Sequence, residues 1–223
     1  MCFSAAASFG ASAVLGTIGI VALKRAQNPN QYFFSGIPVL FALQQFAEGI
    51  LWIALSDPDF AVLKPPMTYA FLFFALIIWP IWAPFSILMV ETHLLRRKIL
   101  KYLLVTGLIM AIYSSLQILL FKVDSFIDYC HISYKIELLY KNNHWSSLPY
   151  LIPTLFAFFI SGNRGIRIVG IVIFIAYIIT RMFYIEYLIS VWCFFAAIVS
   201  ILILFVVVQP HEEEVSFRKR IFR

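Results

Sequence analysis

The chain has 223 residues, of which 62% are apolar and only 13% are charged. Soluble domains carry about 25% charged residues, so these charges are too few for a water-facing surface, and the mean hydropathy of +0.91 agrees. This composition excludes a soluble enzyme and a disordered chain. The 17 basic and 11 acidic residues give a net charge of +6, but the basic residues lie in short clusters between apolar runs. That pattern is typical of membrane topology signals, so no nucleic-acid partner is expected.

Seven apolar runs follow one another along the chain, and a bilayer core of about 30 Å needs about 20 helical residues. The runs are Ser4–Leu23, Tyr32–Leu55, Tyr69–Val90, Ile99–Phe121, Leu148–Ser161, Ile166–Thr180 and Ile185–Val208. The fifth and sixth runs are short, so they form either two full spans or one re-entrant hairpin. The sequence therefore predicts an all-α polytopic membrane protein, with seven transmembrane helices in residues 1–208 and a basic, aromatic tail in residues 209–223.

The basic residues are distributed unequally between the two sides of such a bundle. Twelve of the 17 lie beside the connections after the first, third and fifth runs or in the tail: Lys24, Arg25, Arg96, Arg97, Lys98, Lys101, Arg164, Arg167, Arg218, Lys219, Arg220 and Arg223. Because basic loops stay in the cytoplasm, we expect the N-terminus outside and the C-terminus inside. The expected location is the plasma membrane, where the tail either lies against anionic lipid or serves as a topology signal.

Polar residues interrupt the second apolar run. Gln44, Glu48 and Trp52 are four residues apart and therefore stack on one helix face, with Gln45 beside them. Counted from Ser56 at about 1.5 Å per residue, Glu48 lies about 12 Å deep. A carboxylate at that depth has to pair with a cation or take up a proton. The cluster predicts a binding site for a small molecule, an ion or a proton, and the alternative is a hydrogen-bonded clamp between helices.

Small residues follow one face of the first run and one face of the seventh, which favours close helix approach. Four of them are expected to complete the site: Ser4, Ser8, Ser190 and Cys193. Cys2 would lie at the outer mouth, where its thiol, or the α-amine left after removal of Met1, would be a partner for Glu48. The alternative for Cys2 and Cys193 is simple packing.

The third run contains two prolines, Pro80 and Pro84, within a Trp-Pro-x-Trp-x-Pro pattern that begins at Trp79. Interior prolines remove backbone hydrogen bonds, so we expect a kink or local unwinding near mid-membrane. We include Trp79 in the site because its ring would either wall an aromatic cavity or face lipid.

The longest connection, residues 122–147, is expected outside. Within it Ile132, Ile136 and Leu139 are spaced by four and three residues. This spacing predicts a short interfacial helix over Ile132–Tyr140, lying over the bundle mouth as a lid.

Local motifs assign no catalysis. The chain has no phosphate-binding glycine loop, no paired-histidine zinc motif and no nucleophile elbow. Cys130 and His131 are candidate metal ligands together with Cys2, but the three cysteines would equally allow one disulfide. No cofactor is assigned.

Three functions stay open from these residues. The first is binding or transport of a small molecule, ion or lipid in an outward-facing polar cavity around Glu48. The second is a membrane-embedded enzyme in which the thiol of Cys2 or Cys193 acts with Glu48 as general base. The third is a structural subunit of a homo-oligomer or larger membrane complex, suggested by the 17% aromatic content.

The opening Met1-Cys2-Phe3-Ser4-Ala5, with Ala7-Ser8-Phe9, resembles a family of bacterial multi-pass membrane proteins known only as a domain of unknown function. Three further pieces share its pattern: Gln44-Gln45-x-x-Glu48-Gly49-x-x-Trp52, Trp79-Pro80-x-Trp82-x-Pro84 and Ser190-Val191-Trp192-Cys193-Phe194-Phe195. The resemblance implies a bacterial inner-membrane protein of about seven spans and implies no activity.

Overall fold

A computed structural model describes residues 4–128, 131–136, 148–183 and 188–209, without side-chain placement for residues 148, 181, 183 and 188–194. Its elements, in chain order, are α1 (Ala5–Arg25), a 3-10 turn (Pro29–Gln31), α2 (Tyr32–Ser35), α3 (Ile37–Ser56), a second 3-10 turn (Pro58–Leu63), α4 (Lys64–Leu72), a π-helical segment (Phe73–Ile78), α5 (Trp79–Val90), α6 (Leu94–Leu120), β1 (Val123–Asp128), β2 (His131–Ile136), α7 (Leu148–Ile160), α8 (Arg164–Phe183) and α9 (Leu188–Val208).

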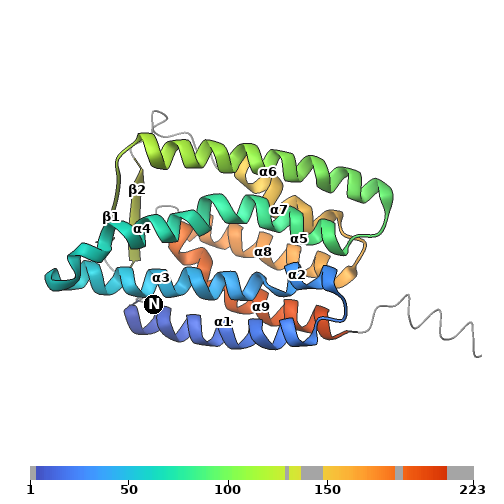
Figure 1. The fold of residues 1–223 in the computed structure, drawn as a ribbon, viewed down its shortest axis with the longest axis horizontal. Helices are drawn as coiled ribbons and strands as arrows, with labels where there is room; N and C mark the ends of the chain where they lie inside the picture. The colour runs from blue at the N-terminus through green and yellow to red at the C-terminus, as the bar shows by residue number, and fades with distance from the viewer. Residues whose placement is uncertain (1–3, 129–130, 137–147, 184–187, 210–223) are drawn as a thin grey trace, which may run out of the picture.

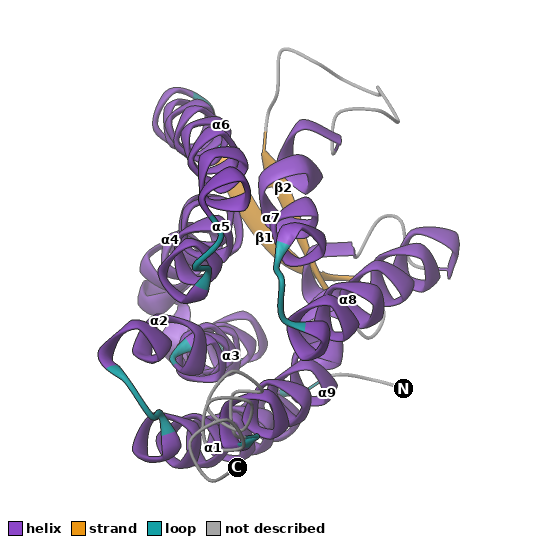
Figure 2. Ribbon diagram, turned by 90° about the vertical axis from the view of Figure 1, so that its right-hand side faces the viewer, coloured by secondary structure: helices purple, strands orange, loops and turns teal. Residues whose placement is uncertain are grey.

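The long helices lie side by side in one elongated bundle (Figure 1). Seen along its axis, α1 packs against α3, the chain continues through α4 and α5 to α6, and α7, α8 and α9 lead back to α1 (Figure 2). Four helical stretches of the described chain are long and apolar enough to span a membrane: Ala5–Arg25, Pro29–Ser56, Pro58–Val90 and Leu94–Leu120. They coincide with the first four expected spans and indicate a membrane protein. Two further apolar helices, Pro149–Ile160 and Phe195–Val208, are shorter.

Helix α1 packs closely against α3 through its small residues. Ser12 Oγ donates a hydrogen bond to the Ala42 carbonyl at 2.8 Å, and the Gly19 backbone lies so near Val39 that a Cβ there would come within 2.5 Å of the valine side chain. Because lipid tails are as apolar as leucine, such backbone proximity and van der Waals contact hold membrane helices together. The expected close approach of the first helix is therefore confirmed.

Pro80 unwinds the third span, as its sequence predicts. In the π-helical segment Phe73–Ile78 the Trp79 amide donates to the Phe74 carbonyl, and the next residue, Pro80, has no N–H to offer to Ala75. The orphaned Ala75 carbonyl instead accepts a 2.6 Å hydrogen bond from the Tyr150 hydroxyl of α7. The broken backbone ladder is thus repaired by a neighbouring helix, which is the condition for tolerating proline within a membrane span.

Gly107 allows α6 to lie directly against this proline segment, because a Cβ at that position would overlap the Pro80 carbonyl oxygen. We expect Gly107→Ala to lower the free energy of unfolding by about 1–3 kcal/mol, since the obstacle is backbone and cannot rotate away. Gly10→Ala is the matched control. Its Cβ would meet nothing within 4 Å, and alanine in a helix is favoured over glycine by about 0.5–1 kcal/mol. Thermal unfolding in detergent measures both, and equal Tm values for the two variants would contradict the packing argument.

Strands β1 and β2 form an antiparallel hairpin at one end of the bundle, beside α3, α4 and α6 (Figure 1). The expected helix over Ile132–Tyr140 is therefore wrong for its described part, since His131–Ile136 is strand β2; residues 137–140 lie outside the described residues. Cross-strand partners share a face, which assigns Ser125 and Tyr134 to the face turned to the helices. There Tyr134 stacks on Phe71 of α4, with ring centroids 4.6 Å apart.

The hairpin is also tied to α4 by polar contacts. Ser125 Oγ and Thr68 Oγ1 lie 2.7 Å apart within hydrogen-bonding distance, and Lys64 Nζ lies 2.7 Å from Asp124 Oδ1. The hydrogen bond from Lys64 lowers the pKa of the Asp124 carboxyl. The hairpin thus covers the bundle end as a docked β-structure in place of the expected helical lid.

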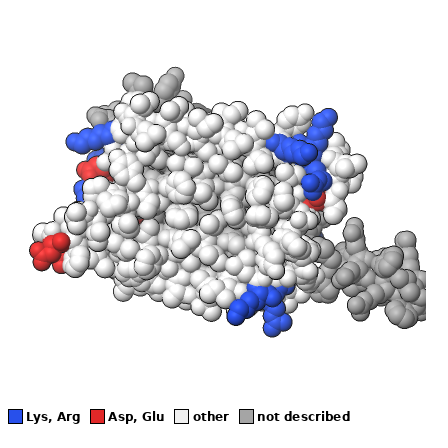
Figure 3. Space-filling model, viewed as in Figure 1, with Lys and Arg blue, Asp and Glu red and all other residues white. Residues whose placement is uncertain are grey.

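On the face shown in Figure 3, charged side chains lie towards the two ends of the bundle, and the surface between them is uncharged. We name them the hairpin end, which includes the α3–α4 connection, and the basic end, which carries Lys24, Arg25 and the start of α6 at Arg96, Arg97 and Lys98. This separation suits a bundle whose middle lies in hydrocarbon and whose ends reach the polar headgroups.

Candidate functional site

The polar residues of α3 face the bundle interior. Gln44, Glu48 and Trp52 are 2%, 3% and 6% exposed, and Gln45 is 5% exposed. The four-residue spacing predicts this common face, and the structure confirms that Glu48 is buried in protein. With Trp79 of α5 these residues form what we name the polar cluster.

One hydrogen bond of the polar cluster lies within α3, and a second connects α3 to α5. Gln45 Nε2 donates to Glu48 Oε2 at 3.0 Å, and Trp79 Nε1 donates to Gln44 Oε1 at 2.7 Å. The Trp79 ring also packs on Phe41, with centroids 4.1 Å apart. The Trp79 side chain is half-buried and makes these contacts with α3; that its ring walls a cavity stays a prediction.

Trp52 lies one turn beyond Glu48, towards the hairpin. Its indole Nε1 is buried and has no hydrogen-bond acceptor within the described part of the chain. Leu51, Trp52 and Ile132 of β2 form one buried cluster, in which Ile132 is 1% exposed. A buried indole N–H normally has a hydrogen-bond acceptor. A polar group bound next to Trp52 would therefore be able to accept a hydrogen bond from its Nε1.

The other predicted site residues lie as follows. Ser8 of α1 is buried at 2% exposure, whereas Ser4 is exposed and caps α1 by accepting a hydrogen bond from the Ala7 amide at 3.2 Å. Ser190 and Cys193 belong to α9, but their side chains, like Cys2 and Cys130 as a whole, lie outside the described residues.

The proposed metal ligand His131 is the first residue of β2 and pairs with Asp128, the last residue of β1. Burial lowers the pKa of its imidazole, which favours the neutral form. Among the residues that the structure describes, no three His, Cys, Asp or Glu side chains are grouped so as to hold a metal ion.

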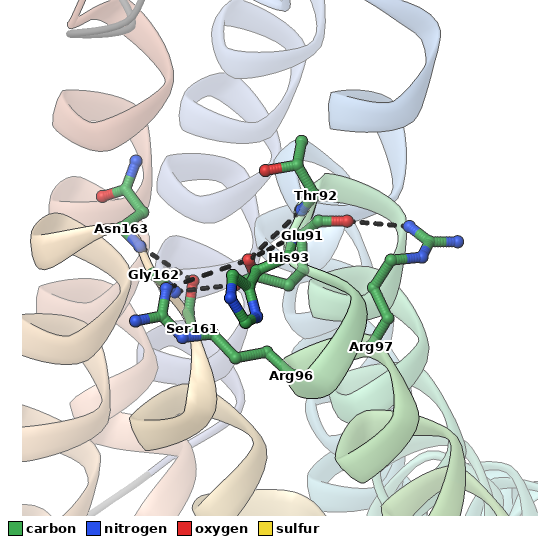
Figure 4. A network of polar contacts seen from close by, with 8 residues as sticks. All are labelled: Glu91, Thr92, His93, Arg96, Arg97, Ser161, Gly162 and Asn163. Atoms are coloured by element: carbon green, nitrogen blue, oxygen red, sulfur yellow. Dashed lines mark hydrogen bonds and ion pairs between the residues drawn. The ribbon is translucent and has the colours of Figure 1, made fainter.

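A second buried carboxylate, Glu91, organises the basic end and was missed by the sequence analysis (Figure 4). It lies directly after α5 and is 6% exposed. Its Oε1 accepts from the Thr92 and His93 amides at 3.2 and 3.1 Å, and its Oε2 accepts from the Gly162 amide at 2.6 Å. The carboxylate therefore joins the α5–α6 connection to the α7–α8 connection, 71 residues away along the chain.

Two arginines complete this Glu91 network. Arg97 Nη1 donates to the carbonyls of Leu88 and Glu91 at 3.0 and 2.7 Å, which satisfies two carbonyls at the C-terminus of α5. Arg96 Nη1 lies 4.0 Å from Glu91 Oε1. The sequence signal was an acid at the end of an apolar run, immediately before a basic cluster, but its distant partner Gly162 leaves no local pattern.

The comparisons with known proteins give one finding. A family model described as "Family of unknown function (DUF6629)" matches residues 1–217. Neither the curated proteins nor the solved structures provide a match. The family match agrees with the expected resemblance to an uncharacterised family, and it assigns no chemistry to any residue.

Proposed function

The chain belongs to this family of unknown function, and we propose from the polar cluster that it is a multi-pass membrane protein that binds a proton or a small cation at Glu48. The site would lie in the outer half of the bundle, beneath the hairpin. The observation that carries the proposal is the burial of Glu48, at 3% exposure, within a helix long and apolar enough to span a membrane.

The surroundings of Glu48 support a cation site. Carboxylate and amide oxygens are the ligands that hard cations take, and the faces of tryptophan rings attract ammonium groups. The polar cluster contains groups of both kinds. Glu48, Gln44 and Gln45 supply the oxygens, and the rings are those of Trp52, one helical turn from Glu48, and Trp79, whose Nε1 donates to Gln44. An ionisable residue at such depth is expensive for the bundle, which favours a functional role for it.

Two features support movement around the site. The π-helical segment Phe73–Ile78 immediately precedes Trp79, and π-bulges are frequent at functional sites. The hairpin closes the end of the bundle above Trp52 through Ile132, and we infer that its opening admits the cation.

The proposed topology is seven crossings, with the N-terminus outside and the basic end in the cytoplasm. The concentration of arginine and lysine at the basic end supports this orientation. Helix α8 has 20 residues, about 30 Å of helix, which supports a full crossing rather than a re-entrant segment. With the resemblance noted above, we place the protein in a bacterial inner membrane.

The purified protein in detergent tests the site by thermal unfolding at increasing Na⁺, K⁺ or tetramethylammonium, repeated across pH. A cation at about 100 times its Kd adds about 2.7 kcal/mol, so we expect Tm to rise by about 5–10 °C. Glu48→Gln removes the charge while keeping the size, and it should abolish the cation response and remove the part of the pH response of Tm that comes from Glu48.

Glu91→Gln is the matched control, since Glu91 is equally buried but lies at the other end of the bundle. Its Tm should be lower at the start and should still rise with the cation. If Glu48→Gln responds to cations and pH as the wild type does, the proposed site is wrong.

A further inference from the structure

A pocket of about 390 Å³ opens at the basic end, between the α1–α2 connection and the α5–α6 connection. Asn30 and Gln31 line it on one side, and Arg97, at the start of α6, lines it on the other. Met89, Val90 and Leu94 supply an apolar wall. The pocket shares no residue with the polar cluster, and its lining combines polar and apolar side chains.

Gln31 presents an unused donor to this pocket. Its side chain is only 5% exposed, and Oε1 is fixed by accepting from the Gln27 amide at 2.8 Å. No hydrogen bond among the described residues uses its Nε2. An amide nitrogen has two N–H donors, so Gln31, as a lining residue of the pocket, has donors left for an acceptor that the pocket would receive.

Positive charge and free backbone donors lie opposite Gln31. The guanidinium of Arg97 is held in place through Nη1, and its remaining N–H groups donate to no described residue. Helix α6, of 27 residues, begins beside the pocket, and its N-cap His93 makes no side-chain capping bond. A helix N-terminus and an arginine fork together suit the oxygens of a phosphate.

Glu91 also lines the pocket, but its charge is offset. Both of its carboxylate oxygens accept backbone N–H groups, and Arg96 stands 4.0 Å away. With Arg97, the Glu91 network therefore has a net charge of +1 next to the pocket.

We propose that this pocket binds a phosphate group, and specifically the phosphate of an anionic phospholipid headgroup. The location at a basic bundle end is where headgroups lie. Leu94, which is 84% exposed, would contact the acyl chain while Gln31 Nε2 and Arg97 contact the phosphate oxygens. The proposal does not depend on the cation site at Glu48.

The test is a Tm titration of the purified protein in detergent with short-chain dihexanoyl phosphatidylglycerol. Gln31→Glu keeps the acceptor for the Gln27 amide but replaces the donor by a negative charge, so we expect the Kd to rise at least tenfold. Gln27→Glu adds the same charge outside the pocket lining and should change the Kd less than twofold. Asn30→Asp, at an exposed position of the lining, is a second variant that should weaken binding if Gln31→Glu fails to fold.

Two comparison ligands identify the source of the phosphate. Phosphatidylglycerol binding at least tenfold tighter than inorganic phosphate supports a lipid headgroup, and equal binding of the two supports the phosphate site but replaces lipid by free phosphate. The proposal is overturned if Gln31→Glu and Asn30→Asp bind phosphatidylglycerol like the wild type, or if phosphatidylcholine of equal chain length binds as tightly.

Discussion

Glu91→Ala is expected to lower the free energy of unfolding by about 3–5 kcal/mol. The substitution removes the acceptor of the Thr92, His93 and Gly162 amides, and a hydrogen bond to a charged group contributes about 1.5–3 kcal/mol. Because these three residues are exposed, water recovers part of that loss, so the expected total is smaller than the sum of the three bonds. It also removes the one side chain that hydrogen-bonds both the α5–α6 and the α7–α8 connections in the described structure. For a chain of this size we expect a fall in Tm of about 10 °C or more.

Thermal unfolding in a fixed detergent measures this loss, with Asp59→Ala as control. Asp59 is an exposed carboxylate at the hairpin end, and its removal should leave Tm unchanged. Glu91→Gln retains one carbonyl oxygen and should fall between the wild type and Glu91→Ala. If Glu91→Ala unfolds at the temperature of the wild type, the Glu91 network contributes nothing to stability.

The first four apolar helices and the polar face of α3 could be predicted because each depends on a local pattern. Apolar runs of about 20 residues report membrane helices directly, and a four-residue spacing places Gln44 and Glu48 on one side of any helix. The missing N–H of Pro80 likewise predicts where the third span unwinds. Its repair by Tyr150 could not be predicted, because nothing in the sequence says that α7 lies beside Ala75.

The hairpin was mistaken for a helix because a short segment fits two periods at once. Ile132, Ile136 and Leu139 have helical spacing, yet Ile132, Tyr134 and Ile136 also alternate as a strand does. β-Branched and aromatic residues favour strands, and this composition was the better signal over so few residues. The alternation in its partner strand, which begins at Val123 after a two-residue connection from the end of α6, supports the same assignment.

Glu91 was missed for a different physical reason. At the end of an apolar run it has the position of an ordinary loop acid, and its burial depends on Gly162, which lies 71 residues away. The position of Glu48 within an apolar run gives its depth in the membrane. The position of Glu91 does not show that the α5–α6 and α7–α8 connections pack together at the basic end. Long-range polar contacts of this kind require the fold.

Ile132→Asp is expected to release the hairpin from the helices. The side chain is 1% exposed against Leu51 and Trp52, and burying a carboxylate there without a partner costs about 3 kcal/mol or more. Undocking avoids that cost, so amide hydrogen exchange in β1 and β2 should accelerate about 100-fold, since about 1.4 kcal/mol is a factor of ten. The amides of α8 should keep their protection.

Ser133→Asp is the matched control, because it adds the same charge on the same strand but on the face turned away from the helices. Its exchange rates should stay close to those of the wild type.

The two variants also test the proposed cation site. An undocked hairpin leaves Trp52 uncovered, so Ile132→Asp should speed cation entry and exit at Glu48, whereas Ser133→Asp should not. Equal exchange in both variants would mean that Ile132 does not hold the hairpin down, and the hairpin could then not be the cover of the polar cluster.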